Sequence, residues 1–255
     1  MTDIEQPDQP VSFVSHMQEM RRRLLIAVGA VIAGFVLCYS FKEPLFAFMI
    51  SPLVDVQGGE GRLIITGVAE FFFTYLKLSF LGGLFMALPI FLWEGWRFAA
   101  PGLYQEEKKM IAPFLVATPL LFYLGGVFTY FVIMPIVIEF FFQFQTAQVI
   151  ALPSVKEYLT FFTKLVFAFG LAFELPVFLL LLAKAGVVTS ASLASFRRYA
   201  VVFIFVAAAL LTPPDPASQL LLALPLILLY ELSVFGAKFV QKAESTKTAE
   251  TTSKA

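Results

Sequence analysis

Six long runs of apolar residues alternate with short polar segments along most of the chain. Charge, glycine or proline bounds each run: 24–41, 71–98, 111–133, 162–183, 199–211 and 218–235. A helix needs about 20 predominantly apolar residues to cross the hydrocarbon core of a bilayer. The pattern therefore predicts an all-α polytopic membrane protein, with six transmembrane helices in a single domain over residues 1–240. Residues 241–255 are rich in Ala, Thr, Ser, Lys and Glu, which predicts a disordered cytoplasmic tail.

Two features predict that these spans are not straight, uniform rods. As a helix, residues 199–211 rise only about 20 Å, against a hydrocarbon core of about 30 Å. We therefore expect either neighbouring helices to shield this fifth span or the bilayer to thin around it. Proline within or at the ends of spans removes a helix hydrogen bond and favours a kink. Such prolines recur along the chain: Pro89, Pro119, Pro135, Pro176 and Pro225.

Lysine and arginine are distributed unequally between the two sides of the predicted spans. Thirteen of the 18 lie on the side of both termini: Arg21, Arg22, Arg23, Arg97, Lys108, Lys109, Lys184, Arg197, Arg198, Lys238, Lys242, Lys247 and Lys254. The other side has four, Lys42, Arg62, Lys156 and Lys164, while Lys77 lies within the second run. Because cytoplasmic segments carry the positive excess, we expect both termini in the cytoplasm. The segments 42–70 and 134–161 then face the periplasm.

Composition argues against several other classes of function. Hydrophobic residues make up 59% of the 255 positions and charged residues 14%, so the bilayer is the expected solvent. The 18 basic and 18 acidic residues balance, and net charge gives no sign of nucleic-acid binding. Cys38 and His16 are the only residues of their types, and no HExxH, GxSxG or phosphate-binding-loop pattern occurs. We therefore expect no enzymatic activity, metal or cofactor.

Glu174 is the most unusual ionisable residue, because it lies near the middle of the fourth run. A carboxylate at the centre of a bilayer costs at least about 2.5 kcal/mol, so Glu174 is expected to be protonated, to face a wet cavity or to bind a polar partner. Three interpretations stay open: a bond to a neighbouring helix, the coupling carboxylate of a proton- or ion-coupled secondary transporter, and a contact that holds a partner helix on a scaffold. Glu94 and Glu231 lie near the ends of their runs, where water can solvate them.

The segment between the second and third runs mixes apolar anchors with acidic residues. Residues 98–109 read FAAPGLYQEEKK. A docking loop fits this composition. An ordinary connector fits it as well, since Pro101 and Gly102 suit a turn and Glu107 is favourable at a helix start.

Four separated motifs resemble those of the TatC family, in the same order on a six-span chain. Residues 16–24, HMQEMRRRL, are similar to the family's HLxELRxRL, with two methionines in place of leucines. Residues 98–107, FAAPGLYQEE, are similar to FxxPxLYxxE, and 169–176, FGLAFELP, to FGxxFExP. Residues 211–219, LTPPDPASQ, are similar to LTPPDxxSQ. Glu174 and Asp215 occupy the acidic positions of the last two motifs.

The resemblance implies the receptor subunit of the twin-arginine protein translocase in the bacterial cytoplasmic (inner) membrane. Such a subunit binds the twin-arginine signal peptides of folded cargo. It then recruits small single-span subunits of the TatA and TatB type into a multimeric complex driven by the proton-motive force. The resemblance also implies a concave, glove-like arrangement of the helices.

The resemblance implies a role for particular residues of this chain. The expected signal-peptide surface consists of Glu19, Arg21, Phe98, Pro101, Leu103, Tyr104 and Glu107. We expect Glu19 and Glu107 to receive the two cargo arginines, because a carboxylate can bind a guanidinium bidentately. Glu174 is expected to contact a partner helix within the membrane. Asp215 is expected to cap the sixth span from its periplasmic turn.

Overall fold

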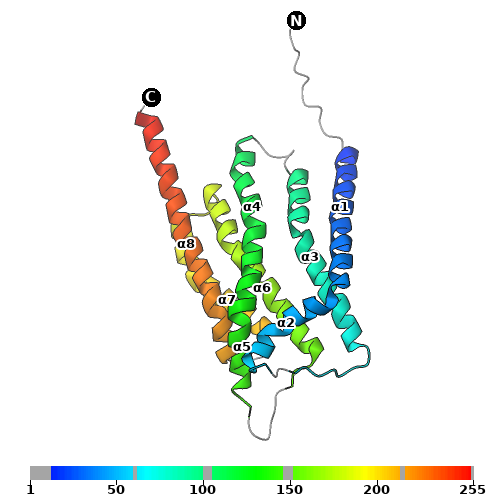
Figure 1. Ribbon diagram of the computed structural model, residues 1–255. Coiled ribbons are helices and arrows are strands. Elements are labelled where there is room, and N and C mark those ends of the chain that lie inside the picture. The colour runs from blue at the N-terminus through cyan, green and yellow to red at the C-terminus, as the bar shows by residue number, and fades with distance from the viewer. Residues whose placement is uncertain (1–12, 60–61, 100–104, 146–151, 213–215, 254–255) are drawn as a thin grey trace.

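The computed structural model describes residues 13–59, 62–99, 105–145, 152–212 and 216–253, most of them helical (Figure 1). The helices are α1 (Phe13–Ser40), α2 (Lys42–Val56), α3 (Glu70–Ala99), α4 (Gln105–Phe128), the π-helical η2 (Thr129–Ile133), α5 (Met134–Phe142), α6 (Val155–Lys184), α7 (Ser190–Leu211) and α8 (Pro216–Ser253). Six stretches are long and apolar enough to cross a membrane: Met17–Ser40, Glu70–Phe98, Pro113–Phe142, Val155–Lys184, Ser190–Leu211 and Pro216–Phe239. The predicted all-α fold with six spans is confirmed.

The third span is one helical rod built from α4, η2 and α5. Its π-helical turn directly precedes Pro135, which lies at the start of α5 and has no N–H to donate. A π-turn is a common way to accommodate such an interruption. At the first residue of this turn, the Thr129 hydroxyl donates to the carbonyl oxygen of Gly125 (2.8 Å). The rod is therefore longer than the predicted run 111–133, and part of the expected periplasmic segment is helical.

Helix caps explain why α6 and α7 begin before their apolar runs. The Ser154 hydroxyl accepts from the backbone N–H of Glu157 (3.2 Å) at the start of α6. Thr189 and Ser192 form a capping box at the start of α7. At 22 residues, α7 rises about 33 Å, so the fifth span is not as short as predicted and can cross the hydrocarbon core.

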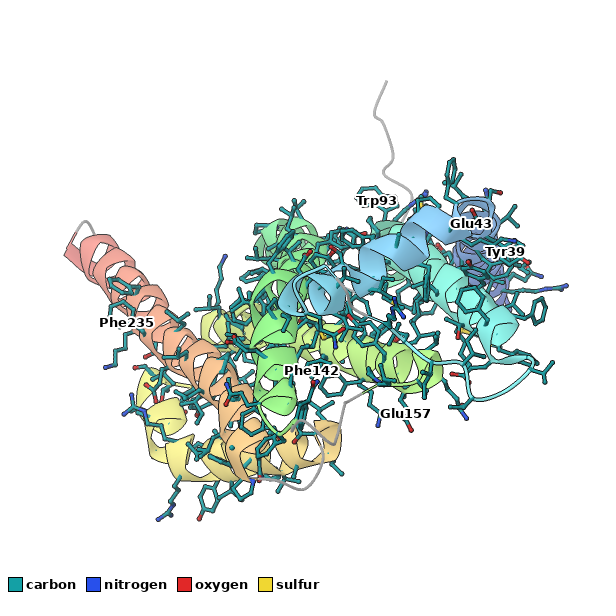
Figure 2. All side chains as sticks on the ribbon, turned by 60° about the horizontal axis from the view of Figure 1, so that its bottom comes forward. Tyr39, Glu43, Trp93, Phe142, Glu157 and Phe235 are labelled. Atoms are coloured by element: carbon teal, nitrogen blue, oxygen red, sulfur yellow. The ribbon has the colours of Figure 1, made fainter. Side chains whose placement is uncertain are left out.

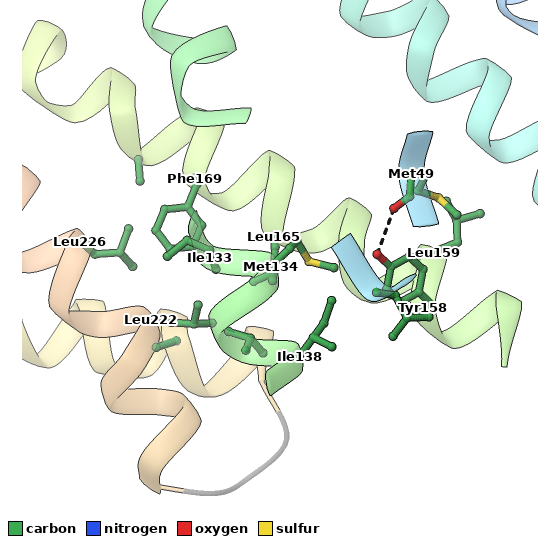
Figure 3. Packing of buried hydrophobic residues seen from close by; sticks show 14 of the residues in the cluster. Met49, Ile133, Met134, Ile138, Tyr158, Leu159, Leu165, Phe169, Leu222 and Leu226 are labelled. Carbon is green, nitrogen blue, oxygen red and sulfur yellow. Dashed lines mark hydrogen bonds between the residues drawn. The ribbon is translucent and has the colours of Figure 1, made fainter. Parts of the chain in front are cut away.

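Helix α2 lies across one end of the molecule instead of spanning it (Figure 1). It buries Met49 and Leu53 against the other helices. The Tyr158 hydroxyl donates to the carbonyl oxygen of Met49 (3.0 Å), a bond drawn in Figure 3. The Tyr130 hydroxyl likewise donates to the carbonyl oxygen of Phe48 (2.8 Å). These two tyrosines hold α2 against α6 and the third span.

The main hydrophobic core lies at this α2 end (Figure 3). Its buried side chains come mainly from α2, the η2–α5 segment, α6 and α8, and include Met49, Leu53, Ile133, Met134, Val137, Tyr158, Leu165, Phe169, Leu222 and Leu226. At the opposite end, α1 begins and α8 ends (Figure 1). The helices contact one another mainly in the order α1–α3, α4–α6, α6–α8 and α8–α7. The helices therefore form an open array instead of a closed bundle, and the α2 end is the most densely packed.

Glycine permits the close crossing of α1 and α3. A Cβ atom on Gly83 would lie 2.5 Å from the backbone nitrogen of Phe35 and 2.9 Å from the carbonyl carbon of Gly34. Backbone atoms cannot move aside as a flexible side chain can. The two helices therefore pack through small residues, as is common between membrane helices.

We expect Gly83→Ala to lower the free energy of unfolding by about 1–3 kcal/mol, because the added methyl group forces the two backbones apart. Gly29→Ala is the matched control, since a Cβ there meets nothing within 4 Å. Thermal unfolding of both variants in one detergent measures the difference. Equal midpoints would contradict this description of the α1–α3 contact.

Helix α8 continues to Ser253 and so includes most of the segment 241–255. The Gln241 side-chain oxygen accepts from the backbone N–H (3.1 Å) and hydroxyl (2.8 Å) of Ser190. This contact joins α8 to the first residue of α7. Alanine, lysine and glutamate in the tail are good helix formers, which favours the extension of α8. The disorder of the tail from Gln241 stays a prediction.

Candidate functional site

Arg23 joins α1 and α3 at the end of the molecule where α1 begins. Its guanidinium donates from Nε (3.1 Å) and Nη2 to Oε1 of Glu19, and from Nη1 to Oε2 of Glu94 on α3 (3.0 Å). Arg97 Nη1 lies 3.8 Å from the other Glu94 oxygen. We call these four residues the charge cluster. Each of its carboxylates faces an arginine, and Arg23 is shared between two of them.

The expectation that water solvates Glu94 was wrong. Glu94 is only 8% exposed, because the close crossing of α1 and α3 brings Arg23 over it. A buried carboxylate without a partner is costly, and the two arginines compensate its charge. One signal in the sequence could have indicated this pairing. Glu94 and Arg97 are three residues apart on one helix, a spacing that favours an ion pair.

The structure brings several of the predicted signal-peptide residues to this same end. Glu19 lies on α1, Phe98 is the penultimate residue of α3, and Glu107 is the third residue of α4 (Figure 1). Arg21 is exposed on α1, two residues from Glu19. The side chain of Glu107 lies outside the described part of the structure. Three further predicted residues lie outside the described residues altogether: Pro101, Leu103 and Tyr104.

Glu174 lies inside the fourth span, on α6. Its carboxyl group faces Thr118 and the backbone of Phe122 on α4. The oxygen Oε1 is buried and has no hydrogen-bond partner among the residues that the structure describes. A buried acceptor that is left unsatisfied costs about 1–3 kcal/mol. The site therefore has an unused hydrogen-bonding atom at membrane depth.

The motif around Glu174 has a clear packing role. Phe169 is fully buried, and a Cβ on Gly170 would lie 2.7 Å from the ring of Phe122. A Cβ on Gly125 of α4 would lie 2.6 Å from the carbonyl oxygen of Phe169. The two helices thus cross with their backbones in close approach. Glu174 lies one turn beyond Gly170, which directs it toward α4.

Asp215 lies outside the described residues, directly before the first residue of α8, Pro216. That position is where a helix cap would be, and its capping role stays a prediction. Beside it, the Gln219 side chain donates to the carbonyl oxygen of Phe205 on α7 (2.8 Å). The Thr212 hydroxyl donates to the carbonyl oxygen of Ala208 (2.9 Å). The Gln219 bond joins α8 to α7, and the Thr212 bond lies at the end of α7.

Potential metal ligands are dispersed in the part of the chain that the structure describes. No group of three or more His, Cys, Asp or Glu side chains there could hold a metal ion. The carboxylates that do gather, Glu19 and Glu94, are matched with guanidinium groups instead. The described site is therefore a set of carboxylate–guanidinium contacts between α1 and α3.

Comparison with known proteins identifies relatives over nearly the whole chain. The sequence model of the family described as Sec-independent protein translocase protein (TatC) matches residues 15–225. A TatC protein of Magnetococcus marinus is 48% identical over 242 residues, covering 95% of this chain and 89% of that protein. One from Helicobacter pylori is 41% identical over 228 residues, covering 89% and 88%. A crystal structure described as the twin arginine translocase receptor TatC has a TM-score of 0.76 at 39% identity, covering 89% of this chain and 99% of that one.

The six-span fold and these relatives define a class: a non-enzymatic, multi-pass membrane subunit of a protein translocase. The chain belongs to the TatC family of the twin-arginine translocase. The resemblance inferred from the four motifs is thereby confirmed, as is the expectation that the protein is not an enzyme.

Proposed function

We propose that this chain is the receptor that reads twin-arginine signal peptides and recruits small single-span subunits of the TatA and TatB type. The observation that carries the proposal is the geometry of Glu19. Its carboxylate already accepts two N–H groups of one guanidinium, that of Arg23. An arginine fork therefore fits this position, and a cargo arginine presents the same fork.

Two carboxylates account for the preference for arginine over lysine. Arginine offers a planar fork of donors, whereas lysine offers a compact ammonium group of the same charge. Glu107, at the start of α4, is proposed as the second acceptor. The segment 98–104 would supply the apolar surface through Phe98, Pro101, Leu103 and Tyr104. Arg21, exposed beside Glu19, would border the site.

The proposed site faces the cytoplasm of a bacterial cell, with the protein in the inner membrane. The start of α1 and the end of α8 lie at the same end of the molecule as the charge cluster (Figure 1). Thirteen of the 18 lysines and arginines belong to segments on this side in the proposed topology. Cytoplasmic segments carry such an excess. Both termini and the peptide site are then on the side where cargo is made.

Arg23 is an internal competitor for the cargo arginine in this proposal. Arg23→Gln removes the guanidinium that occupies Glu19, so we expect a twin-arginine peptide to bind up to about fivefold more tightly, the scale of one exposed ion pair. Fluorescence anisotropy with labelled peptide and protein in nanodiscs measures the affinity.

Arg97→Gln is the matched control for this experiment. This substitution removes one positive charge from the same cluster. The native Arg97 contacts Glu94 and not Glu19. We expect its effect on peptide affinity to be smaller than that of Arg23→Gln. Unchanged or weaker binding by the Arg23 variant, or an equal gain in both variants, would show that Glu19 is not released for cargo.

Site-specific photocrosslinking tests the receptor function itself. A photoreactive residue at position 98 is expected to label a twin-arginine signal peptide and to label its twin-lysine counterpart much less. Position 235, on an exposed face of α8, supplies the control for nonspecific contact in the membrane. Labelling at position 98 that does not depend on the arginines would overturn the proposal.

A further inference from the structure

Three lysines line a depression at the end of the molecule where α2 lies. Lys77 and Lys156 line a hollow of about 390 Å³, and Lys156 and Lys164 line a second of about 530 Å³. Thr66, Lys156 and Thr160 belong to both hollows, so the two adjoin. We call this combined depression the lysine basin.

The ammonium groups of the lysine basin are not neutralised by the protein. In the described structure, Lys77, Lys156 and Lys164 have no side-chain hydrogen bond, ion pair or ring contact, whereas Arg23, Arg197 and Lys42 do. Each of the three side chains is exposed. Their positive charge is therefore available to a ligand.

Two acidic residues also line the basin, so it has three lysines against two carboxylates, and neither carboxylate forms a salt bridge with them in the described structure. Glu70 uses one oxygen to accept from the backbone N–H and hydroxyl of Thr66 (both 2.7 Å) and from the N–H of Gly67 (3.0 Å). Its other oxygen accepts from the backbone N–H of Lys156 (2.9 Å). Glu70 is thus engaged in joining the segment before α3 to the start of α6. Glu157, labelled near the start of α6 in Figure 2, is the other acid that lines the basin.

The depth of the lysines indicates where the ligand comes from. Lys77 lies seven residues after the first residue of α3, and Lys164 nine after the first of α6, so they are about 10 and 13 Å along membrane-spanning helices. The headgroup layer on each side of the hydrocarbon core is only about 5–7 Å thick. A cation below that layer is costly, and a lysine avoids the cost by extending its ammonium group toward the headgroups, where a lipid phosphate can pair with it.

The walls of the basin suit an amphipathic ligand. Phe73 and Leu159 line the first hollow beside Lys77 and Lys156. Phe161, Leu210 and Leu211 line the second beside Lys164. A ligand that carries a phosphate and acyl chains can satisfy both the ammonium groups and the apolar walls. A soluble phosphate or an acidic peptide segment would leave the apolar surface unused.

We propose that the lysine basin binds the phosphate of an anionic phospholipid from the leaflet at the α2 end, with its acyl chains along the apolar wall. A lipid with a single negative charge, such as phosphatidylglycerol, is preferred over phosphatidylcholine, because the choline group would face three ammonium groups. Helices α3, α6 and α7 all contribute to the lining. The bound lipid therefore ties together elements from both halves of the chain.

Native mass spectrometry of the purified protein tests this site. The protein is mixed with equal amounts of phosphatidylglycerol and phosphatidylcholine of identical chains, and the retained lipids are counted. We expect the wild type to retain phosphatidylglycerol preferentially. Lys77→Gln and Lys164→Gln should each lower this preference by about fivefold, and the double glutamine variant should lower it further. A factor of about five corresponds to the contribution of one basic residue near an anionic lipid. Lys77→Arg with Lys164→Arg should keep the preference, because charge is retained.

Lys42→Gln is the matched control, because Lys42 lies at the same end but outside the basin, with its ammonium 4.7 Å from the ring centroid of Tyr39. We expect this variant to keep the wild-type preference. Equal retention of phosphatidylglycerol in wild type and the double glutamine variant would overturn the proposal, as would an equal loss in Lys42→Gln. If inorganic phosphate raises the unfolding midpoint as much as phosphatidylglycerol does, the site takes a free anion and the lipid assignment is wrong.

Discussion

Replacement of Glu174 by alanine is expected to reduce capture of the small single-span subunits by about threefold to twentyfold. Hydrogen bonds between membrane helices average about 0.6 kcal/mol and reach about 1.7 kcal/mol, which sets this range. The Glu174 oxygen Oε1 is buried and has no hydrogen-bond partner among the described residues, but the side chain as a whole is partly exposed. A rotation of the carboxyl group would therefore bring this oxygen to a polar group on a partner helix. Glu174→Gln keeps hydrogen-bonding atoms without the ionisable proton and should stay within about twofold of wild type.

Crosslinking of the small subunits to the variants in membranes measures this assembly step. Thr118→Val is the informative companion, because it removes the side chain on α4 that Glu174 faces within the chain. We expect it to assemble nearly as well as wild type. Wild-type assembly by Glu174→Ala would contradict a partner contact. A loss in Thr118→Val equal to that in Glu174→Ala would assign Glu174 to packing of α6 on α4 instead.

The number and type of the membrane helices could be predicted from the sequence because the apolar runs are long. Their boundaries could not, because caps such as Ser154 and Thr189 extend a helix through polar residues that a hydropathy pattern excludes. Helix α2 was also not predicted. Its 15 residues are too few to cross a bilayer, so a search for long apolar runs does not find it. Its position depends on tertiary contacts, including the bonds of Tyr130 and Tyr158 to its carbonyl oxygens.

Of the charge cluster, only Glu19 was predicted as a site residue, and its pairing with Arg23 was not predicted. The motif around Glu19 contains three consecutive arginines, and spacing alone does not say which one reaches α3. That choice depends on the glycine crossing of α1 and α3, which is a tertiary contact. Glu94 was missed for the same reason. Its burial and its partner Arg23 exist only once the two helices are packed together.

The largest effect on peptide binding is expected from removal of both proposed arginine acceptors. Glu19→Gln and Glu107→Gln should each weaken binding of a twin-arginine peptide by up to about fivefold, since each pair is near water. Together they should weaken it by up to about 25-fold if the two contacts are independent. Glutamine keeps the size and polarity of glutamate, so the fold should be preserved. Glu231→Gln is the matched control, because Glu231 is half-exposed and pairs with Arg197 outside the site.

The most direct test of the receptor proposal is the affinity of the wild type and of the double glutamine variant for a twin-arginine peptide and for its twin-lysine counterpart. We predict that the wild type prefers arginine and that Glu231→Gln keeps this preference. The double variant should bind the twin-arginine peptide weakly and no longer distinguish it from twin-lysine. If the double variant binds with wild-type affinity and still rejects twin-lysine, then Glu19 and Glu107 do not read the arginine pair.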